Sequence, residues 1–255
     1  MGSVAVAFSG GVDSTVLAVL ARDLLGPNCL AVTVVTPFVS KAEQIQARRL
    51  ARALRLKHRV LRWDGLLTTP LARNPSDRCY LCKRVIMQRI LALARREGLA
   101  WVADGTQRDD ARDDRPGRRA ARELGIRTPL ADAGFRKNDV RRVARLLGLS
   151  NADQPAMACL ATRFPYGTRL TAKALACVAD AEACLHRMGF VQVRVRVHGD
   201  LARIELAPSD LVRAARPAVR PRVVQVLRKV GFRYVTLDLA GYRMGSMNVA
   251  PSRQD

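Results

Sequence analysis

Apolar runs alternate with amphipathic stretches along the first half of the chain. Residues 4–8 and 30–35 are uncharged runs of the kind found in strands buried on both faces, and residues 58–63 and 101–103 are predicted as further strands. After the first run, residues 15–25 space their apolar side chains as one face of a helix does. Strands that alternate with helices predict an α/β fold, with a parallel sheet covered by helices on both faces.

Helix boundary signals support this prediction. Ser40, with Glu43 three residues later, forms a capping box that predicts a helix to about residue 54. Residues 137–147 are amphipathic at helical spacing, and Gly148 marks the end of that helix.

The pattern changes in the second half of the chain. From residue 191 to residue 198, valines alternate with polar residues, which is the period of a strand with one buried face. Gly199 and Asp200 follow as a two-residue turn, and apolar residues alternate again beyond it. We therefore predict a β-hairpin.

This hairpin belongs to a smaller second domain. Helices are predicted over residues 171–188 and 209–230, and residues 234–239 form a last strand, which together predict an α+β fold. We expect one domain over residues 1–150 and a second over residues 151–255.

The link between the first strand and the first helix reads Ser9-Gly10-Gly11-Val12-Asp13-Ser14. Two adjacent glycines let the backbone turn tightly and approach a ligand, and the start of a helix offers unpaired amides and a positive dipole end. The spacing matches neither the Walker A loop nor the dinucleotide-binding fingerprint. We predict a phosphate site of another type, the alternative being an ordinary glycine-rich turn.

Ligands of open parallel sheets bind beyond the carboxyl ends of the strands. Asp104 and Gly105 directly follow one predicted strand, and the highly charged segment 107–119 comes next. A charged segment of this composition is usually a solvated loop. Its attachment to a strand end favours a loop that lies beside the ligand.

The charge of the chain is strongly basic. Its 255 residues include 44 Lys and Arg against 22 Asp and Glu, a formal net charge of +22, which suits a nucleic acid or an anionic ligand. The basic residues are mostly arginines spread along a sequence rich in alanine, leucine and valine, so we discount the charge as evidence for RNA. Without a membrane-spanning run or a leader pattern, we expect a cytoplasmic protein with no membrane partner.

Six cysteines are present, and their spacing separates them into two groups. Cys79 and Cys82 form a Cys-x-x-Cys pair at the start of a helix predicted to reach residue 96. By itself this pair suits a metal cluster, a zinc site, a disulfide or unrelated thiols. Three cysteines on apolar faces are expected in the core: Cys29, Cys177 and Cys184. The histidines have no metal-ligand spacing: His58, His186 and His198.

The loop at residues 9–14 resembles the Ser-Gly-Gly-x-Asp-Ser loop of the PP-loop, or N-type ATP pyrophosphatase, family. Over nearly its whole length the chain is similar to one subfamily, the LarE sulfur transferases of nickel-pincer nucleotide biosynthesis. The shared motifs are Cys79-x-x-Cys82-Lys83, Asp104-Gly-Thr, Arg115-Pro-Gly, Cys159-x-x-x-Arg163-Phe-Pro-Tyr-Gly, the Val-Arg-Val-Arg strand and residues 234–248. The family usually carries a helix before the first strand, and this chain begins almost directly on that strand.

The resemblance implies an enzyme that splits ATP into AMP and pyrophosphate. Its substrate is a small nucleotide, pyridinium-3,5-biscarboxylic acid mononucleotide, whose carboxylates are adenylated and then converted to thiocarboxylates. ATP binding is assigned to Ser9, Gly10, Gly11, Asp13, Ser14, Thr33, Asp104 and Gly105. Asp13 is also the nearest candidate ligand for Mg²⁺ and a candidate catalytic residue.

The resemblance allows two sources of sulfur. Some family members sacrifice the sulfur of one cysteine and retain dehydroalanine, and Cys159 stands at that position. Others hold a [4Fe-4S] cluster on three cysteines, which leaves the fourth iron open to carry a sulfide. Because Cys79, Cys82 and Cys159 are all present, we favour the cluster. Cys159 is the direct sulfur donor if no cluster forms.

The resemblance also assigns the phosphate of the substrate to arginines. Arg194 and Arg196 share one face of a strand, and with Arg163 they can clamp a phosphate through planar donor forks. The alternative is a polar face turned to solvent. Glu182 and Glu205 are similar to acidic residues near that site.

Three other functions stay open. A PP-loop tRNA thiolase suits the basic charge, but such loops often carry lysine where Val12 stands, and no separate RNA-binding domain is evident. An amide-forming synthetase would not need the cysteines, and a non-catalytic nucleotide-binding protein would not need the substrate-side residues. The expected partners are the nucleotide substrate, other nickel-pincer enzymes, and further copies of the chain in a homotrimer or homohexamer built through the second domain.

Overall fold

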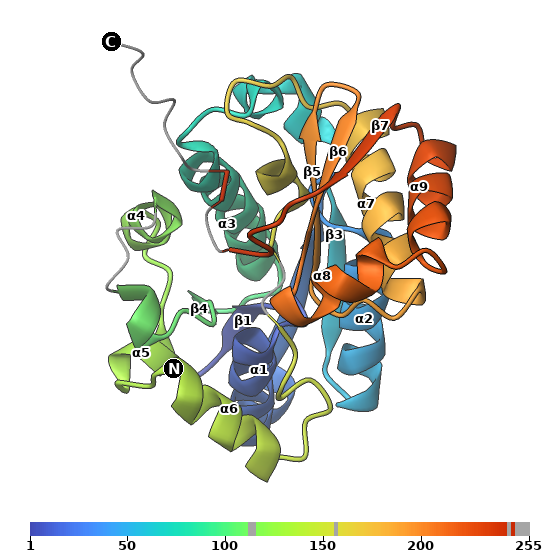
Figure 1. Ribbon diagram of the computed structural model, residues 1–255. Helices are drawn as coiled ribbons and strands as arrows, with labels where there is room; N and C mark the ends of the chain where they lie inside the picture. The colour runs from blue at the N-terminus through green and yellow to red at the C-terminus, as the bar shows by residue number, and fades with distance from the viewer. Residues whose placement is uncertain (112–115, 156–157, 244–245, 248–255) are drawn as a thin grey trace. The chain divides into compact units, whose positions relative to one another are not determined.

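The computed structural model describes residues 1–111, 116–155, 158–243 and 246–247, apart from the side chains of residues 110, 111 and 116 (Figure 1). Two parts of the sequence motifs, Arg115 and Asn248, lie outside the described residues. Among the described helices, none combines the length and the apolar composition that a membrane span requires.

The chain divides into two compact units. The first comprises Met1–Leu66 and Ser76–Met157, and the second comprises Leu67–Pro75 and Ala158–Asp255. The segment Leu67–Pro75 therefore belongs to the second unit, although its place in the sequence put it within the predicted first domain.

The first unit is built on a four-stranded parallel sheet. Its strands are β1 (Val4–Ala7), β2 (Cys29–Val35), β3 (His58–Arg62) and β4 (Trp101–Ala103), in the order β3-β2-β1-β4. β1 pairs in parallel with β2 and β4, and β2 pairs in parallel with β3. The predicted α/β fold is confirmed.

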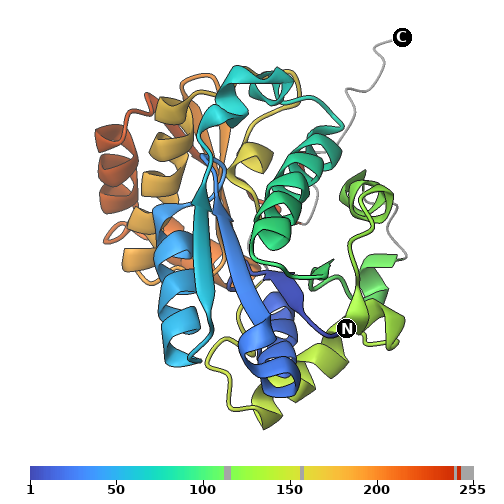
Figure 2. The same ribbon diagram turned by 180° about the vertical axis from the view of Figure 1, so that it is seen from behind.

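Helices cover both faces of this sheet, as predicted. One face carries α1 (Val12–Leu25), α2 (Lys41–Ala53) and α6 (Lys137–Leu146), and Figure 1 shows α1 beside α6. The other face carries α3 (Arg78–Arg96) and the short α4 (Pro116–Glu123), seen from behind in Figure 2. Two short elements, α5 (Pro129–Asp132) and the 3-10 turn η4 (Arg108–Ala111), lie between β4 and α6 in the sequence.

The two cores of this unit follow from the pleat of β1. Val4 and Val6 pack with the α1 face, whereas Ala5 packs with the α3 face, because successive side chains of a strand point to opposite sides. A strand covered on both sides carries no charged residue, which explains the uncharged run in the sequence.

Two boundary predictions had different outcomes. The capping box is confirmed, since the Glu43 amide donates to Ser40 Oγ at 3.2 Å and the Ser40 amide donates to Glu43 Oε2 at 2.7 Å. The segment 107–119 was predicted as a loop, which is wrong where η4 and α4 form. Ala120 and Ala121 are buried in α4, and the charged residues around these small apolar side chains led to the prediction of a loop.

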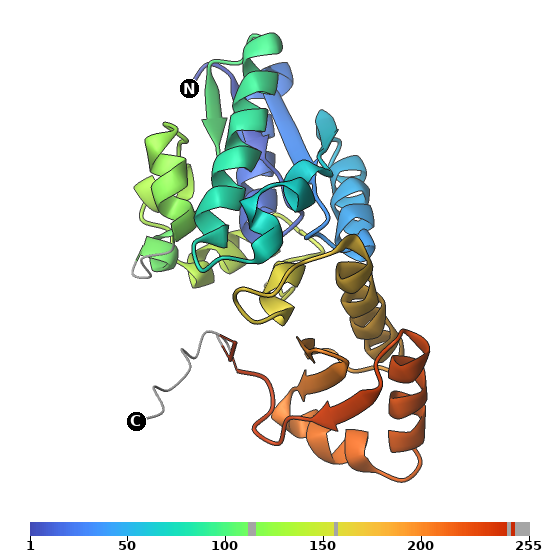
Figure 3. The same ribbon diagram turned by 90° about the horizontal axis from the view of Figure 1, so that it is seen from above.

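The second unit has a three-stranded mixed sheet (Figure 3). β5 (Val193–His198) and β6 (Leu201–Leu206) form the predicted antiparallel hairpin, and β7 (Tyr234–Leu237) pairs with β6 in parallel. Its helices are α7 (Ala172–Arg187), α8 (Pro208–Ala215) and α9 (Arg220–Lys229), with α7 packed on β5 and α9 on β7. The predicted α+β fold is confirmed.

β5 has the period of a half-buried strand, but most of its length is buried on both faces. Val193 and Val195 are fully buried, but Arg194 and Arg196 on the other face are only 9% and 4% exposed. A period of two arises wherever apolar and polar side chains alternate, and it does not reveal whether the polar side is covered.

Asn74 holds the segment Leu67–Pro75 in the second unit. It is completely buried and has a left-handed backbone, with φ of 49°. Its Nδ2 donates to the carbonyl oxygens of Pro165 at 2.8 Å and Phe164 at 3.2 Å, and its own carbonyl oxygen accepts the Gly167 amide at 3.0 Å. The segment therefore belongs with residues that lie some ninety positions further along the sequence.

We expect Asn74→Ala to destabilise the turn at residues 158–170 by about 2–4 kcal/mol, because it removes these side-chain hydrogen bonds and puts a Cβ-bearing residue without a polar group in the left-handed region. Asn74→Gly loses the same hydrogen bonds without the backbone strain, so it should cost about 1 kcal/mol less. Amide hydrogen exchange of peptides from residues 158–170 measures both effects. Unchanged protection in both variants would contradict this role.

Candidate functional site

The loop between β1 and α1 is held by its own hydrogen bonds. Ser14 Oγ donates to the Gly11 carbonyl oxygen at 3.0 Å, the Ser9 amide donates to Ser14 Oγ at 3.2 Å, and the Gly11 amide donates to Ser9 Oγ at 3.2 Å. Gly10 has φ of +80°, and a Cβ added there would lie 3.0 Å from Ala47 Cα. Both facts favour glycine. The loop is a rigid turn at the start of α1, as a phosphate site requires.

Asn151, from a distant part of the sequence, forms hydrogen bonds that stabilise this loop. Its Nδ2 donates to the Gly10 carbonyl oxygen and to Thr15 Oγ1, both at 3.0 Å, and the residue is only 3% exposed. Sequence reasoning missed Asn151. It lies in an irregular stretch after α6, where neither periodicity nor a motif marks an individual residue.

Gly105 lies directly against the backbone of the glycine loop. A Cβ added to Gly105 would be 2.7 Å from the Ser14 amide nitrogen and 2.9 Å from the Asp13 carbonyl carbon. The loops after β1 and β4 therefore touch at the carboxyl edge of the sheet. This brings together the residues predicted for ATP binding on the two strands.

Two lysines reach the carboxylates at this edge. Lys137 Nζ donates to both carboxylate oxygens of Asp13, at 2.9 and 2.6 Å, and Lys83 Nζ lies 2.6 Å from Asp104 Oδ2. Burial acts to raise the pKa of Asp104, but the Lys83 ammonium and hydrogen bonds from Thr106 outweigh burial and lower it. Both carboxyl groups therefore face a cation.

Sequence reasoning did not assign a role to either lysine. Lys83 directly follows the Cys-x-x-Cys pair, so its place in that motif could have identified it as a site residue. Lys137 is the first residue of α6, and its amide donates to Asp109 Oδ2 at 2.8 Å. Nothing in the sequence links it to a residue 124 positions earlier.

Thr33 is tied to the residue that precedes the glycine loop. Its hydroxyl donates to the Phe8 carbonyl oxygen at 2.7 Å and lies 2.8 Å from His58 Nε2. Because the only hydroxyl hydrogen points to Phe8, His58 Nε2 must be the donor in the second bond. Burial and the nearby Arg48 lower the pKa of His58, which keeps the imidazole neutral.

Cys79 and Cys82 lie at the start of α3, as predicted. Cys79 is exposed and Cys82 is half-buried. Lys83 comes next in the same helix turn, so its ion pair with Asp104 attaches this turn to the loop after β4. Within the first unit, the two thiols therefore belong to the same edge of the sheet as the glycine loop.

The other cysteines differ in how deeply they are buried. Cys159, in the second unit, is exposed. Burial raises the pKa of the Cys29 thiol to about 11, which agrees with a core residue. Cys177 and Cys184 are half-buried on α7, where Cys177 Sγ donates to the Val230 carbonyl oxygen at 3.0 Å.

Within each unit, the described residues gather no group of three or more His, Cys, Asp or Glu side chains that could hold a metal. A cluster on Cys79, Cys82 and Cys159 would take ligands from both units. All three thiols are outside disulfides and at least partly accessible, and thiolates are the donors that an iron-sulfur cluster requires. The donor chemistry fits such a group.

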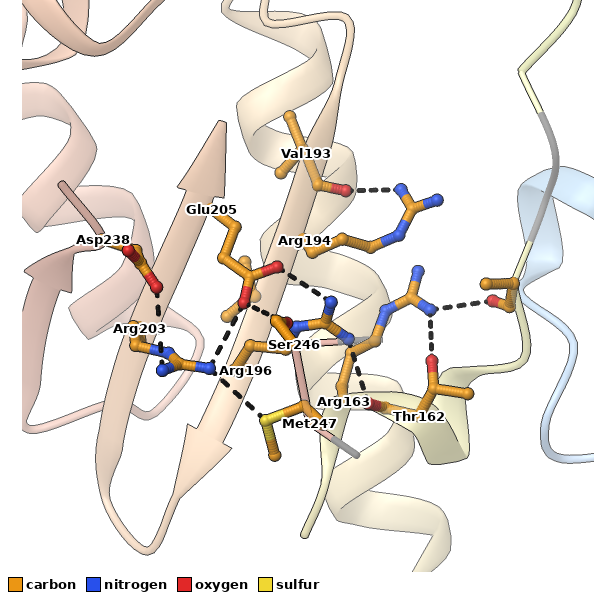
Figure 4. A network of polar contacts seen from close by, with 12 residues as sticks. Thr162, Arg163, Val193, Arg194, Arg196, Arg203, Glu205, Asp238, Ser246 and Met247 are labelled. Carbon is orange, nitrogen blue, oxygen red and sulfur yellow. Dashed lines mark hydrogen bonds and ion pairs between the residues drawn. The ribbon is translucent and has the colours of Figure 1, made fainter. Parts of the chain in front are cut away.

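Figure 4 shows the three predicted arginines of the second unit, Arg163, Arg194 and Arg196, together with Glu205. Arg163 is 3% exposed and binds Glu182 with a bidentate pair, Nε to Oε1 at 2.8 Å and Nη2 to Oε2 at 2.9 Å. Arg196 Nη2 donates to Glu205 Oε2 at 2.8 Å and Nη1 donates to the Thr162 carbonyl oxygen at 3.0 Å.

Positive charge exceeds negative charge in this cluster. Arg194 lies over the ring of Tyr242, 5.2 Å from its centroid. Burial lowers the pKa of Arg194, and the charges of Arg163 and Arg196 lower it further. Arg196 Nε is buried and, among the described residues, has no hydrogen-bond acceptor. An anion at this face would relieve the repulsion between the guanidinium groups.

Glu205 is the buried centre of this network. It is fully buried and accepts from Arg196, from Arg203 Nη2 at 3.2 Å and from Ser246 Oγ at 2.6 Å. Arg203 also lies 3.6 Å from Asp238. Sequence reasoning missed Arg203 and Ser246, because only the antiparallel register and the return of the chain near its end bring them to Glu205.

Comparison with known proteins identifies one matching family model and several similar proteins. A family model described as a family of unknown function (DUF7411) matches residues 2–145. An uncharacterized protein of Synechocystis is 42% identical over 243 residues, which is 95% of this chain and 91% of that protein. Pyridinium-3,5-bisthiocarboxylic acid mononucleotide synthase of Lactiplantibacillus plantarum is 41% identical over 246 residues, 96% of this chain and 88% of the synthase. A tRNA(Ile)-lysidine synthase of Bradyrhizobium is 36% identical over 161 residues, 59% of this chain and 42% of that enzyme.

We expect Gly105→Ala to displace the glycine loop, because its Cβ would overlap backbone atoms that have no flexible end to move. ATP affinity should fall by about tenfold or more, equivalent to about 1.4 kcal/mol. Isothermal calorimetry with ATP measures this change. Gly2→Ala is the matched control, since no atom lies within 4 Å of an added Cβ there. Equal affinity in the two variants would show that the loops do not need this contact.

The pH dependence of stability tests the bond between Thr33 and His58. The pKa of His58 is lowered in the folded protein, so only the unfolded chain takes up a proton readily near pH 6.5. The contribution of neutral His58 is present above about pH 6.5 and is lost as the pH falls through the folded pKa. In urea unfolding between pH 8 and 5, the wild type should lose more stability than His58→Gln. If the free energy of unfolding falls equally with pH in both proteins, the proposed contribution of neutral His58 is contradicted.

Proposed function

The chain belongs to the LarE family of PP-loop ATP pyrophosphatases, and on this premise we propose that it is an ATP-dependent sulfurtransferase that makes pyridinium-3,5-bisthiocarboxylic acid mononucleotide from the corresponding biscarboxylic acid. The observation that carries the proposal is the similarity, over nearly the whole chain, to the Lactiplantibacillus synthase that is named for this product. The similarity spans both units, so it includes the ATP side and the substrate side.

The first unit binds ATP. The turn from Ser9 to Ser14 receives the phosphates, and the ammonium groups of Lys83 and Lys137 at the same edge offset their negative charge. Asp13 supplies the type of oxygen ligand that Mg²⁺ prefers, and Mg²⁺ bound there would offset charge on the departing pyrophosphate. Thr33 and Gly105 complete the site on the neighbouring strands.

The reaction proceeds in two stages. A substrate carboxylate oxygen attacks the α-phosphorus of ATP, the bond from that phosphorus to the bridging oxygen breaks, and pyrophosphate leaves. The resulting acyl adenylate has AMP as its leaving group, so a sulfur nucleophile can attack the carbonyl carbon. AMP then departs with the carbon-oxygen electron pair. A sulfide nucleophile leaves a thiocarboxylate directly, whereas a cysteine thiolate leaves a thioester that becomes a thiocarboxylate when its Cβ–S bond breaks.

The second unit binds the phosphate of the mononucleotide. Arg194 and Arg196 supply the donor forks, whereas the guanidinium of Arg163 is engaged by Glu182. The buried Nε of Arg196 and the lowered pKa of Arg194 support an anion site on this face. Glu182 and Glu205 fix the orientation of these arginines through their ion pairs.

Sulfur is delivered at Cys159. In the first form of the proposal, Cys79, Cys82 and Cys159 would hold a [4Fe-4S] cluster, and the cluster would be the source of sulfide. In the second form, Cys159 gives up its own sulfur, so that its Cβ–S bond breaks with loss of the Cα proton and dehydroalanine remains. Both forms require the Cys159 thiol to be accessible, which its exposure supports.

The wider setting is part of the same proposal. The product is passed to the other enzymes of nickel-pincer nucleotide biosynthesis in the cytoplasm. The chain acts as a homotrimer or homohexamer assembled through its second domain.

One experiment tests the function and the sulfur source together. The protein is purified anaerobically, reconstituted with iron and sulfide, and incubated with ATP and the biscarboxylic acid mononucleotide. We expect pyrophosphate release that depends on the mononucleotide, together with thiocarboxylate detected by mass spectrometry. Cys159→Ala should keep pyrophosphate release within about twofold and lose sulfur transfer by at least 100-fold, because adenylation does not use the thiol.

Cys184→Ala is the matched control, since Cys184 lies on α7 and its thiol contacts Arg187. It should retain both steps. Visible absorbance that is lost in Cys79→Ala and Cys82→Ala supports the cluster. A wild-type protein that is colourless, transfers one sulfur atom per chain and loses the mass of that sulfur from its polypeptide supports the sacrificial form. No pyrophosphate release with the mononucleotide would refute the proposed function.

A tRNA thiolase is the second candidate. It is supported by the partial similarity to a tRNA(Ile)-lysidine synthase. That enzyme is covered over only 42% of its length, so the similarity supports the ATP-binding domain and not RNA binding. Thiolated nucleosides formed in tRNA, with binding that weakens steeply as salt rises, would favour this candidate.

A further inference from the structure

The chain around Cys159 is a short turn that is fixed from inside the second unit. Cys159 is the N-cap of the 3-10 turn η5 (Leu160–Arg163). Its carbonyl oxygen accepts the Thr162 amide at 3.0 Å and Thr162 Oγ1 at 2.7 Å. The thiol is exposed while the backbone beneath it is bonded.

Arg163 adds the contacts that fix the direction of the Cα–Cβ bond of Cys159. Its Nη1 donates to the carbonyl oxygens of Ala158 at 2.9 Å and Cys159 at 3.2 Å, and to Thr162 Oγ1 at 2.9 Å. These two carbonyl groups belong to the peptide units on either side of the Cys159 Cα. When both peptide planes are held, the Cα–Cβ bond of Cys159 is held as well.

The other side of the same guanidinium is anchored to the core. Nε and Nη2 bind the two oxygens of Glu182, which lies on α7 and also accepts the Val195 amide at 3.0 Å. Arg163 is thus a brace between the Cys159 turn, α7 and β5. Asn74 holds the far end of the turn through the carbonyl groups of Phe164 and Pro165.

We propose that Arg163 is a positioning residue that aims the Cys159 thiol, with phosphate binding left to Arg194 and Arg196. Nε and both Nη nitrogens of Arg163 already donate within the turn and to Glu182, so a phosphate would have to break the bonds that hold Cys159. This assignment rests on the proposed function. It holds for a thiol that donates its own sulfur and for one that binds a cluster.

Sulfur transfer is sensitive to such positioning. Reacting atoms must lie about 3–3.5 Å apart with aligned orbitals, and a displacement of about 1 Å can reduce the rate about 100-fold. Adenylation involves the carboxylate and ATP, and it makes no use of the Cys159 thiol. Loss of the Arg163 contacts should therefore slow sulfur transfer and leave the rate of adenylation unchanged.

Arg163→Lys tests this separation, because one ammonium group cannot span a carboxylate and two carbonyl oxygens. We expect single-turnover thiocarboxylate formation at saturating ATP and mononucleotide to fall about 100-fold. Mononucleotide-dependent pyrophosphate release and the KM for the mononucleotide should stay within twofold of wild type. Arg222→Lys, at an exposed position on α9, is the matched control and should change neither step.

Thr162→Val provides a milder test that leaves the ion pair with Glu182 intact. It removes the hydroxyl that bridges the Cys159 carbonyl oxygen and Arg163. We expect a smaller loss of sulfur transfer, about tenfold, with adenylation unchanged. If Arg163→Lys fails to fold, as shown by lost hydrogen-exchange protection throughout α7, this variant decides the question.

Amide hydrogen exchange gives a readout that is independent of activity. Peptides from residues 158–164 should exchange faster in both variants, with α7 protected as in wild type. A KM for the mononucleotide that rises tenfold in Arg163→Lys, with sulfur transfer intact at saturation, would overturn the proposal and make Arg163 a phosphate ligand. A wild type that releases no pyrophosphate would refute the proposed function instead, and the exchange data would still test the brace.

Discussion

The first unit depends on the contact between two loops at the carboxyl edge of its sheet. β1 and β4 are parallel neighbours, so their loops leave the sheet side by side, and Gly105 lies against the backbone of Asp13 and Ser14 with no room for a side chain. This contact places Asp13 and Asp104 in one region, where Lys137 from α6 and Lys83 from α3 reach them. Because Lys83 follows Cys82 directly, the same contact also brings the Cys-x-x-Cys turn to this edge.

Charge pairing organises the second unit in a comparable way. Arg163 with Glu182 and Arg196 with Glu205 are buried ion pairs, which contribute little net stability because both charges lose their hydration. Their contribution is geometric, since bidentate and multiple hydrogen bonds fix the guanidinium planes. Positive charge still exceeds negative charge there, which leaves the polar face of β5 suited to an anion. The basic composition of the chain says nothing about this arrangement, because most of its arginines lie elsewhere.

The elements that the sequence predicted well are those whose pattern has a local cause. The uncharged runs of β1 and β2, the capping box at Ser40 and the two-residue turn at Gly199 each reflect interactions within a few residues or burial on both faces. The errors have the opposite origin. α4 forms in a segment whose many charges predicted a loop, and β5 is buried on its arginine face because partners from distant segments cover those side chains.

The sequence by itself determined the order of strands and helices, the glycine loop at the start of α1, and the motifs that identify the family, because these features depend on local periodicity and on residue types at fixed spacing. Only the tertiary structure decided that Lys83 and Lys137 meet the two aspartates, that Asn74 belongs to the second unit, and that Arg163 holds the carbonyl groups around Cys159. These are pairings between side chains and backbone groups whose geometry depends on packing. A linear sequence carries no signal for them until the chain has folded.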